Sequence, residues 1–406
     1  MKKLLALLLA VVMVACLFAG CTPSDGEGTG STNPSGNTNT QTSKYKVAMI
    51  TDYGDITDQS FNQTTYEAVK AFCETNSLSY KYFKPESNST DARIAMVDAA
   101  VADGYNVIVM PGYAFAGTIA GVQDEYESVK FIALDVSEWD LEDAFYNHDE
   151  NGNRTTLIDE NNKPHQGSNV YCAVYQEELA GYMAGYAAVK LGYKHLGFLG
   201  GMAVPAVIRY GFGFVQGANA AAVDMDIAEE VTVEYVYGGQ FFGDADITGV
   251  MDTWYQTLGV EVVFACGGGI YTSAAEAAAK VTGAKVIGVD VDQAAIIDAY
   301  GKDMTVTSAM KGLAATVNTL LKAVVDGKFD KDFGGKLENL GLVSGEDPTV
   351  NYVQIPMETT QFGDGFSKDD YKALVAGMFD GSIKVSNATD AMPETSITVN
   401  SHDQIK

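Results

Sequence analysis

Two kinds of apolar pattern alternate along the chain beyond residue 44. Short runs that are apolar on both faces lie at residues 46–52, 106–112, 129–135, 195–201, 261–269, 285–290 and 304–310. Between them, apolar residues recur at spacings of three and four, as at residues 66–72, 94–101, 179–189 and 274–281. The first pattern is typical of buried parallel strands and the second of amphipathic helices. Their alternation predicts an α/β fold with doubly wound parallel sheets.

The predicted strands fall into an early and a late group, which indicates two lobes. The early group ends at Asp135 and the late group begins near Val170. Between them, residues 137–169 are polar and contain the Asn151-Gly152 pair, so they predict a surface excursion or a hairpin.

We expect the strand at residues 304–310 and the helix after it to return to the first lobe, and the tail from Gly335 to pack on the second. The predicted N-terminal lobe is therefore residues 44–136 with 303–326, and the predicted C-terminal lobe is residues 137–302 with 327–406. Several crossings between two similar sheets predict a hinge beside a cleft.

The N-terminus carries the pattern of an exported bacterial lipoprotein. Lys2 and Lys3 precede an apolar run at residues 4–18, and Ala-Gly-Cys follows at residues 19–21. This pattern predicts a signal peptide at residues 1–20 and a lipid on Cys21. Residues 21–43 hold no aliphatic or aromatic side chain, so they predict a disordered tether to a lipid anchor on the outer face of the cell membrane.

The overall charge argues against nucleic acid as a partner. The chain has 26 Lys and Arg against 53 Asp and Glu, a formal net charge of −27. Such a surface repels nucleic acid polymers and anionic lipid. Cys73, Cys172 and Cys266 lie within apolar patterns and form no Cys-x-x-Cys pair, so we interpret them as small buried hydrophobic residues.

Motifs for cofactors and metals are weak. The glycines at residues 267–269 follow a strand, but neither GxGxxG spacing nor a Walker lysine accompanies them. The four histidines are scattered without metal-ligand spacing. We therefore expect no cofactor, no metal site and no enzymatic activity. Arg209 lies among apolar residues and is interpreted as a structural ion-pair partner.

Aspartates at strand ends are the first candidate ligand residues. Asp52, Asp135 and Asp290 follow or end predicted strands. Ligands of open α/β sheets bind at the carboxyl ends of the strands. Each aspartate alone could instead cap the next helix. Together, the three favour a shared cleft.

Phe61 is unusual because it stands in a polar loop, beside Asn62. One interpretation is a buried hydrophobic staple at the start of the next helix. The other is an aromatic platform for a ligand, with Asn62 as a neighbouring donor and acceptor.

The chain resembles the basic membrane protein family of ABC-transporter solute-binding lipoproteins, which includes purine nucleoside receptors. The resemblance spans nearly the whole chain after Lys44. It rests on the order and spacing of segments at residues 51–63, 175–188, 197–217, 263–269, 286–293 and 307–311. It implies a type I periplasmic-binding-protein fold, with two doubly wound lobes joined by a hinge and a nucleoside held between them.

The resemblance also implies roles for single residues. Phe61 would stack on one face of the base, and Phe242, or else Phe241, would cover the other. Asn62 and Asp135 resemble the partners of the base edge.

The remaining implied roles concern the sugar and the rim of the cleft. Asp290 and Lys311, with the backbone of Gly267 and Gly268, would hold the ribose hydroxyls, Asp292 competes with Asp290, and Asp52 lines the rim.

The implied function is that of a monomeric receptor. It would deliver a small molecule to an ABC permease and its ATPase. A sugar receptor and a sensory receptor of the same fold remain open alternatives. A nucleoside hydrolase or phosphorylase is less favoured, because the sequence shows no metal-chelating aspartate cluster and no phosphate pocket.

Overall fold

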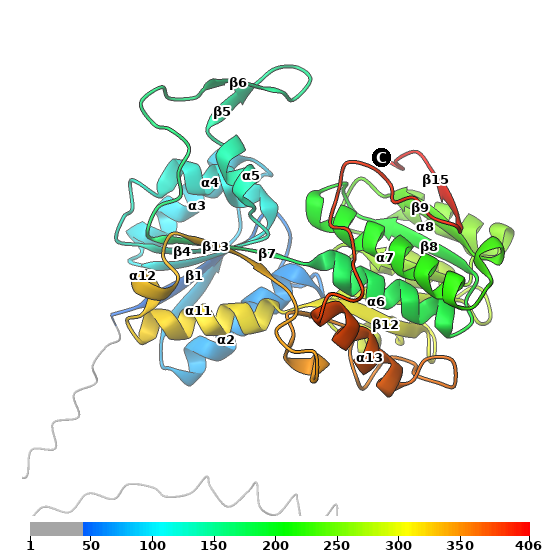
Figure 1. Ribbon diagram of the computed structural model, residues 1–406. Coiled ribbons are helices and arrows are strands. Elements are labelled where there is room, and N and C mark those ends of the chain that lie inside the picture. The colour runs from blue at the N-terminus through cyan, green and yellow to red at the C-terminus, as the bar shows by residue number, and fades with distance from the viewer. Residues whose placement is uncertain (1–43) are drawn as a thin grey trace, which may run out of the picture. The chain divides into compact units, whose positions relative to one another are not determined.

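Two parallel sheets organise the protein in this computed structural model, which describes residues 44–406 (Figure 1). The predicted signal peptide at residues 1–20, the lipidated Cys21 and the tether at residues 21–43 lie outside the described residues. A strand overlaps each of the seven runs at residues 46–310 that the apolar pattern predicts.

The first sheet has the order β13-β7-β4-β3-β1-β2, and all its pairings are parallel. Its strands are β1 (Lys46–Ile50), β2 (Ser79–Phe83), β3 (Val107–Pro111), β4 (Lys130–Leu134), β7 (Val170–Tyr175) and β13 (Lys336–Leu340). Successive side chains of a strand point to opposite faces. Val47 and Val109 therefore pack in one cluster with α2 (Phe61–Thr75) and α11 (Leu313–Val325).

The opposite face of the first sheet is covered by different helices. Ala48 and Ile108 pack in a second cluster with α3 (Thr90–Ala102) and α4 (Ala116–Val122). The sheet is thus buried on both faces, as its continuous apolar strands predict.

The second sheet has the order β14-β12-β11-β10-β8-β9-β15, and its one antiparallel pairing joins β12 to β14. Its strands are β8 (His195–Gly200), β9 (Thr232–Tyr237), β10 (Val262–Cys266), β11 (Lys285–Asp290), β12 (Thr305–Lys311), β14 (Val353–Gln354) and β15 (Thr398–Ser401). The helices that follow its strands or pack beside them are α6 (Glu177–Lys190), α7 (Pro205–Asp224), α8 (Ala245–Thr253), α9 (Tyr271–Ala278), α10 (Ala294–Ile297) and α13 (Lys368–Phe379). The short α12 (Phe329–Asp332) follows α11.

The structure corrects the predicted lobe membership of three strands. The strand at residues 304–310, β12, pairs with β11 in the second sheet and does not return to the first lobe. Conversely, β7 and β13 belong to the first sheet, although they fall in the ranges 137–302 and 327–406 that we assigned to the C-terminal lobe. A buried parallel strand is apolar on both faces in either sheet, so its pattern does not encode its neighbours. Helix α11 does pack against α2 in the first lobe.

Three chain segments cross between the lobes and are hydrogen-bonded to one another. They follow β7, β12 and β13. The Gln176 amide donates to the Leu340 carbonyl over 3.0 Å, and the Gly312 amide donates to the Tyr352 carbonyl over 2.7 Å. The crossings therefore form one cross-linked hinge beside the carboxyl ends of both sheets.

The polar excursion at residues 137–169 connects β4 to β7, so it belongs to the first lobe and not, as we predicted, to the C-terminal lobe. It contains α5 (Glu138–Asp143) and the antiparallel pair β5 (Tyr146–His148) and β6 (Arg154–Leu157), which is the predicted hairpin. The pair projects away from the lobe beyond α5 (Figure 1).

Helices α6 and α7 approach each other through glycines. Cβ atoms at Gly181 and Gly185 would overlap the carbonyl oxygens of Tyr210 and Phe214, and one at Gly217 would overlap the carbonyl of Tyr182. Only glycine permits this backbone contact. The contact fixes the first turn of α6, which carries a buried carboxylate of the site described below.

We predict that Gly185→Ala destabilises the protein by about 1–3 kcal/mol, because its methyl group meets rigid backbone. Gly249 in α8 is the matched control, since a Cβ there meets nothing within 4 Å. Gly249→Ala should stabilise the protein by roughly 0.5–1 kcal/mol through helix propensity. Urea unfolding of both variants checks this. Equal stability of Gly185→Ala and the parent protein would contradict the packing argument.

Candidate functional site

A cavity of about 420 Å³ lies between the carboxyl ends of the two sheets. This volume falls within the range of small-molecule sites. The residues predicted to bind ligand all line it, namely Asp52, Phe61, Asn62, Asp135, Phe242, Gly267, Gly268, Asp290 and Lys311. The structure thus brings together residues that are up to 259 positions apart in the sequence.

Asp135 and Asp290 occupy equivalent places in the two lobes. Asp135 directly follows β4 of the first sheet, and Asp290 ends β11 of the second. Both have left-handed backbone conformations, with φ of 63° and 65°. Residues other than glycine rarely adopt this conformation, although aspartate tolerates it better than most. Such strain concentrates at functional sites, where the surrounding structure maintains it.

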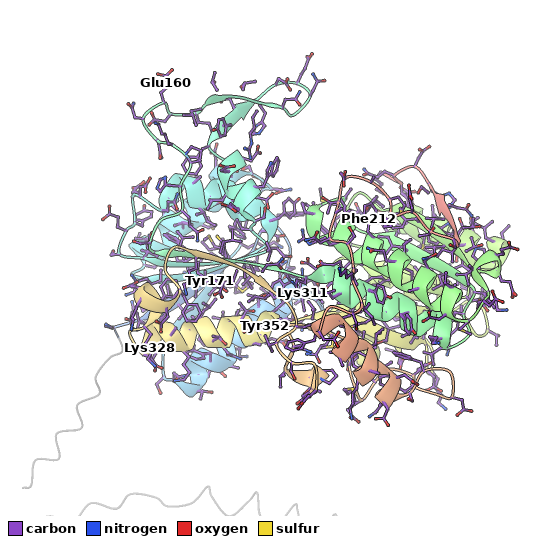
Figure 2. All side chains as sticks on the ribbon, viewed as in Figure 1. Glu160, Tyr171, Phe212, Lys311, Lys328 and Tyr352 are labelled. Atoms are coloured by element: carbon purple, nitrogen blue, oxygen red, sulfur yellow. The ribbon has the colours of Figure 1, made fainter. Side chains whose placement is uncertain are left out.

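Lys311 joins these two aspartates. Its Nζ lies 2.7 Å from Asp135 Oδ2, 3.4 Å from Glu177 Oε1 and 3.6 Å from Asp290 Oδ1. Its side chain is only 3% exposed. The residue lies where the chain crosses between the lobes, near Tyr352 of a neighbouring crossing (Figure 2). One buried cation therefore links both strand ends to the hinge.

The electrostatics of this cluster follow from burial and crowding of like charges. Burial raises the pKa of Asp135 to about 6, and the carboxylates of Glu177 and Asp290 add to the rise while Lys311 opposes it. Burial alone would lower the pKa of Lys311, but the carboxylates of Asp135, Asp290 and Glu177 raise it above its ordinary value. The ammonium thus stays charged, while Asp135 takes up a proton more readily than an exposed carboxyl group.

Arg209 forms the predicted structural ion pair. Its Nε lies 2.7 Å from Oε2 of Glu177, the fully buried residue that begins α6. Arg209 also lines the cavity. The next residue, Glu178, has a pKa raised to about 7 by burial and by Glu177.

The position of Phe61 is compatible with both interpretations offered for it. The ring packs partly buried against the core cluster and also lines the cavity. Lys311 Nζ lies 4.7 Å from its centroid, within the range of a cation–π interaction.

Asn62 is oriented by two carboxylates. Its Nδ2 donates to Asp52 Oδ1 over 3.3 Å and to Asp58 Oδ2 over 3.2 Å. Its Oδ1 is buried without a hydrogen-bond partner, and so is Oδ1 of Asp135. Buried polar atoms normally have partners, so two unpaired acceptors on cavity-lining residues are unusual.

Asp52 organises its own loop as well as the rim. Its Oδ1 accepts from the backbone amides of Tyr53 and Gly54, both at 2.7 Å. Asp292, the competitor of Asp290, accepts from the Ala294 amide and the Thr359 hydroxyl and is not among the cavity-lining residues.

Phe241 and Phe242 both line the cavity but differ in exposure. Phe242 is 57% exposed, whereas the Phe241 ring packs against the core cluster and against Gly267. A Cβ on Gly267 would lie 2.8 Å from Phe241 Cδ1, and the φ of Gly267 is 144°. Gly267 is therefore required for the ring, besides presenting backbone to the cavity. The sequence left the choice between the two rings open. In the structure Phe241 is packed against the core, whereas Phe242 is mostly exposed.

The sequence interpretation missed several cavity residues. Tyr113 follows the end of β3 and shares the strand-end signal of the aspartates, so it could have been found. Tyr53 donates to Met202 Sδ of the other lobe over 3.4 Å. Tyr210 lies in a buried helical segment, where nothing in the pattern distinguishes it from core residues. The same holds for Glu177, which contacts Lys311 and Arg209 but is not among the cavity-lining residues.

The chain is similar to several known proteins. A family model described as "ABC transporter substrate-binding protein PnrA-like" (Bmp) matches residues 45–353. The nucleoside-binding ABC-transporter protein BmpA of Lactococcus lactis is 26% identical over 361 residues, which cover 85% of this chain and 90% of that protein. An uncharacterized lipoprotein of Pyrococcus abyssi is 25% identical over 354 residues, covering 84% of this chain and 76% of that protein.

Among solved structures, an ABC-transporter solute-binding protein from Aeropyrum pernix has a TM-score of 0.60 at 21% identity, covering 84% of this chain and 87% of its own. This likeness, with the two parallel sheets, confirms the predicted type I periplasmic-binding-protein fold.

We predict that Asp135 makes stability fall as pH rises from about 4 to about 6. Its folded pKa of about 6 exceeds its ordinary value of 3.8, so the folded protein binds more protons than the unfolded chain in this window. A shift of about 2 units corresponds to roughly 3 kcal/mol. Asp135→Asn should abolish this part of the pH dependence of the unfolding free energy, measured by urea denaturation.

The control for this titration is Asp244. A side-chain hydrogen bond from Lys406 lowers the pKa of Asp244 to about 2, from an ordinary value of 3.8. Its stabilising contribution is therefore fully present above pH 3.8 and is lost as the pH falls from 3.8 to about 2. Asp244→Asn should leave the slope between pH 4 and 6 unchanged. If Asp135→Asn also leaves the slope unchanged, the burial argument for Asp135 is wrong.

Proposed function

Because this chain belongs to the Bmp family of PnrA-like substrate-binding proteins of ABC transporters, we propose that its cavity binds a purine nucleoside for import. The chain is a solute-binding protein, and its family is not one of enzymes. The observation that carries the proposal is the cavity wall, in which Phe61 of the first lobe and Phe241 and Phe242 of the second accompany strand-end carboxylates. The Lactococcus lactis relative is named as a nucleoside-binding protein, which supports the same ligand class.

The two unpaired acceptors suit the edge of a base at the Phe61 side, and the neighbouring aromatic ring favours a base over a plain sugar. Asn62 Oδ1 and Asp135 Oδ1 are buried and can accept hydrogen bonds from N–H groups of a purine edge. Phe61 directly precedes Asn62 at the start of α2, so a base stacked on that ring would lie beside these acceptors. Hydrogen bonds from ring N–H groups to Asp135 would also stabilise its ionised form and so lower its pKa.

The ribose side of the proposal uses Asp290, Lys311 and the glycine backbone. Asp290 accepts from hydroxyl donors, and Lys311 donates. Gly267 and Gly268 both have positive φ and no side chain, which lets the backbone approach a sugar closely.

The cellular setting of the proposal rests on residues 1–43 and on the family. Cys21 would carry the lipid and residues 22–43 would link it to the lobes, which places a monomeric receptor at the outer face of the membrane beside its permease and ATPase. The name of the Pyrococcus abyssi relative, a lipoprotein, supports the anchor. Among residues 44–406, no helix is both long and apolar enough to span a membrane.

We predict that Phe61→Ala weakens nucleoside binding roughly 5- to 150-fold, since stacking on an aromatic side chain contributes about 1–3 kcal/mol per base. Phe72 is the matched control, because it lies on the same helix and packs on the core without lining the cavity. Phe72→Ala should lower stability and leave affinity unchanged. Calorimetry with inosine, guanosine, adenosine, the free bases and ribose measures both variants.

Asp290→Asn serves as the sugar-side arm of the same experiment. Asparagine also tolerates the left-handed backbone, so the substitution tests charge rather than strain. It should weaken all nucleosides alike, by about 1.5–3 kcal/mol for each charge-assisted hydrogen bond lost. If ribose alone binds as tightly as any nucleoside and Phe61→Ala has no effect, the site is a sugar site and the nucleoside proposal fails.

A further inference from the structure

The two lobes are hydrogen-bonded to each other directly beside the cavity. The Ser60 hydroxyl of the first lobe donates to Asp290 Oδ2 of the second over 2.7 Å. Beside it, Gln293 Nε2 of the second lobe donates to the Gln59 carbonyl of the first over 3.1 Å. Ser60 and Gln293 are at most 1% exposed, and Asp290 is 5% exposed. Bonds this well buried are shielded from competition with water.

Ser60 is available for this contact because another residue caps its helix. It occupies the N-cap position of α2, where a serine side chain normally accepts from the first-turn amides, yet its hydroxyl makes no capping bond. Asp58 accepts from the amides of Asn62 and Gln63 at 2.9 and 3.0 Å instead. The loop thus directs the Ser60 hydroxyl away from its own helix and toward the other lobe.

The backbone on both sides of the contact is held in an uncommon conformation. Gln59 has φ of 56° and Asp290 has φ of 65°. Strain of this kind persists only where the surrounding structure maintains it, and it is often part of a mechanism. Here it aligns the donors and acceptors that join the lobes.

Gln293 is fixed within its own lobe. Its side-chain Oε1 accepts from the Val289 backbone amide over 3.0 Å, and its backbone amide donates to the Ser308 hydroxyl over 3.1 Å. Its Nε2 therefore reaches the Gln59 carbonyl from a rigid base. The second lobe presents a preformed pair, Asp290 and Gln293, to the loop at residues 59–60.

We propose that Ser60, assisted by Gln293, is a positioning residue that holds the lobes closed and orients Asp290 for the ligand. The hydroxyl satisfies Oδ2 of Asp290. Oδ1 lies 3.6 Å from Lys311 Nζ, beyond hydrogen-bond distance, and so is able to accept from a ligand hydroxyl. The orienting role rests on the proposed function, whereas the closing role does not depend on which ligand binds.

Closure and affinity are then linked. If only the closed form presents a complete site, the apparent dissociation constant rises in proportion as the closed population falls. If the whole free energy of the Ser60–Asp290 hydrogen bond stabilises the closed form, its loss would lower nucleoside affinity about 10- to 100-fold.

The test compares Ser60→Ala, Ser60→Thr and Thr65→Val in the full chain. Ser60→Thr retains the hydroxyl. Thr65→Val removes an equally buried hydroxyl that bonds only within α2, to the Phe61 carbonyl. Spin labels on cysteines introduced at the exposed positions Lys70 and Glu276, one in each lobe, report the distance between the lobes by pulsed electron resonance. Calorimetry with inosine reports affinity.

Without ligand, Ser60→Ala should shift the distances to longer values, while Ser60→Thr and Thr65→Val should match the parent protein. Ser60→Ala should also bind inosine about 10- to 100-fold more weakly. Unchanged distances in Ser60→Ala would overturn the closing role, and longer distances with unchanged inosine affinity would overturn the orienting role. If distances lengthen but the parent binds no nucleoside, the closing role stands and the proposed function fails.

Discussion

The buried ammonium of Lys311 is the interaction on which the site depends. Lys311 is the last residue of β12 in the second sheet. Its ammonium contacts Asp135 at the end of β4 in the first sheet and lies near Glu177 and Asp290. Burying a charge is costly unless charged and polar partners offset the loss of water. Without the cation, three buried carboxylates would repel one another across the cavity. Their placement at the strand ends therefore requires this lysine, and the rings of Phe61, Tyr175 and Tyr210 surround it.

The scaffold around Lys311 explains why the cation stays in place. Glu177 begins α6, and α6 is pressed against α7 by glycines that allow the two backbones to touch. Arg209 of α7 then pairs with the same Glu177, so the carboxylate is held between two cations. Meanwhile the chain after Lys311 is bonded through Gly312 to Tyr352, which belongs to another crossing. The hinge, the helix pair and the cavity-lining carboxylates of Asp135 and Asp290 thus form one connected unit, so a change in the angle between the lobes would alter that unit.

The parts of the candidate site that follow from a general rule are predictable from the sequence, and those that depend on strand pairing or tertiary contacts are not. Asp135 and Asp290 were predictable because strand ends in α/β sheets face the ligand cleft. Phe61 was predictable because an aromatic ring in a polar loop is unfavourably exposed unless it packs against the protein or a ligand. The partners of β7 and β12 were not predictable, since continuous apolar strands fit either sheet. Nor was the role of Ser60, because its pattern is that of an ordinary helix cap, and only the tertiary structure shows that Asp58 has taken over the capping.

The most direct test of this account is the coupling between Lys311 and Asp135, measured as unfolding free energies in a double-mutant cycle. Lys311→Met alone should destabilise the protein by about 3–5 kcal/mol, because it leaves buried carboxylates without their cation. Adding Asp135→Asn should restore part of that loss, since it removes one of the stranded charges, so the two effects should be strongly non-additive. If the two losses instead simply add, Lys311 does not hold the carboxylate cluster together and the account is wrong.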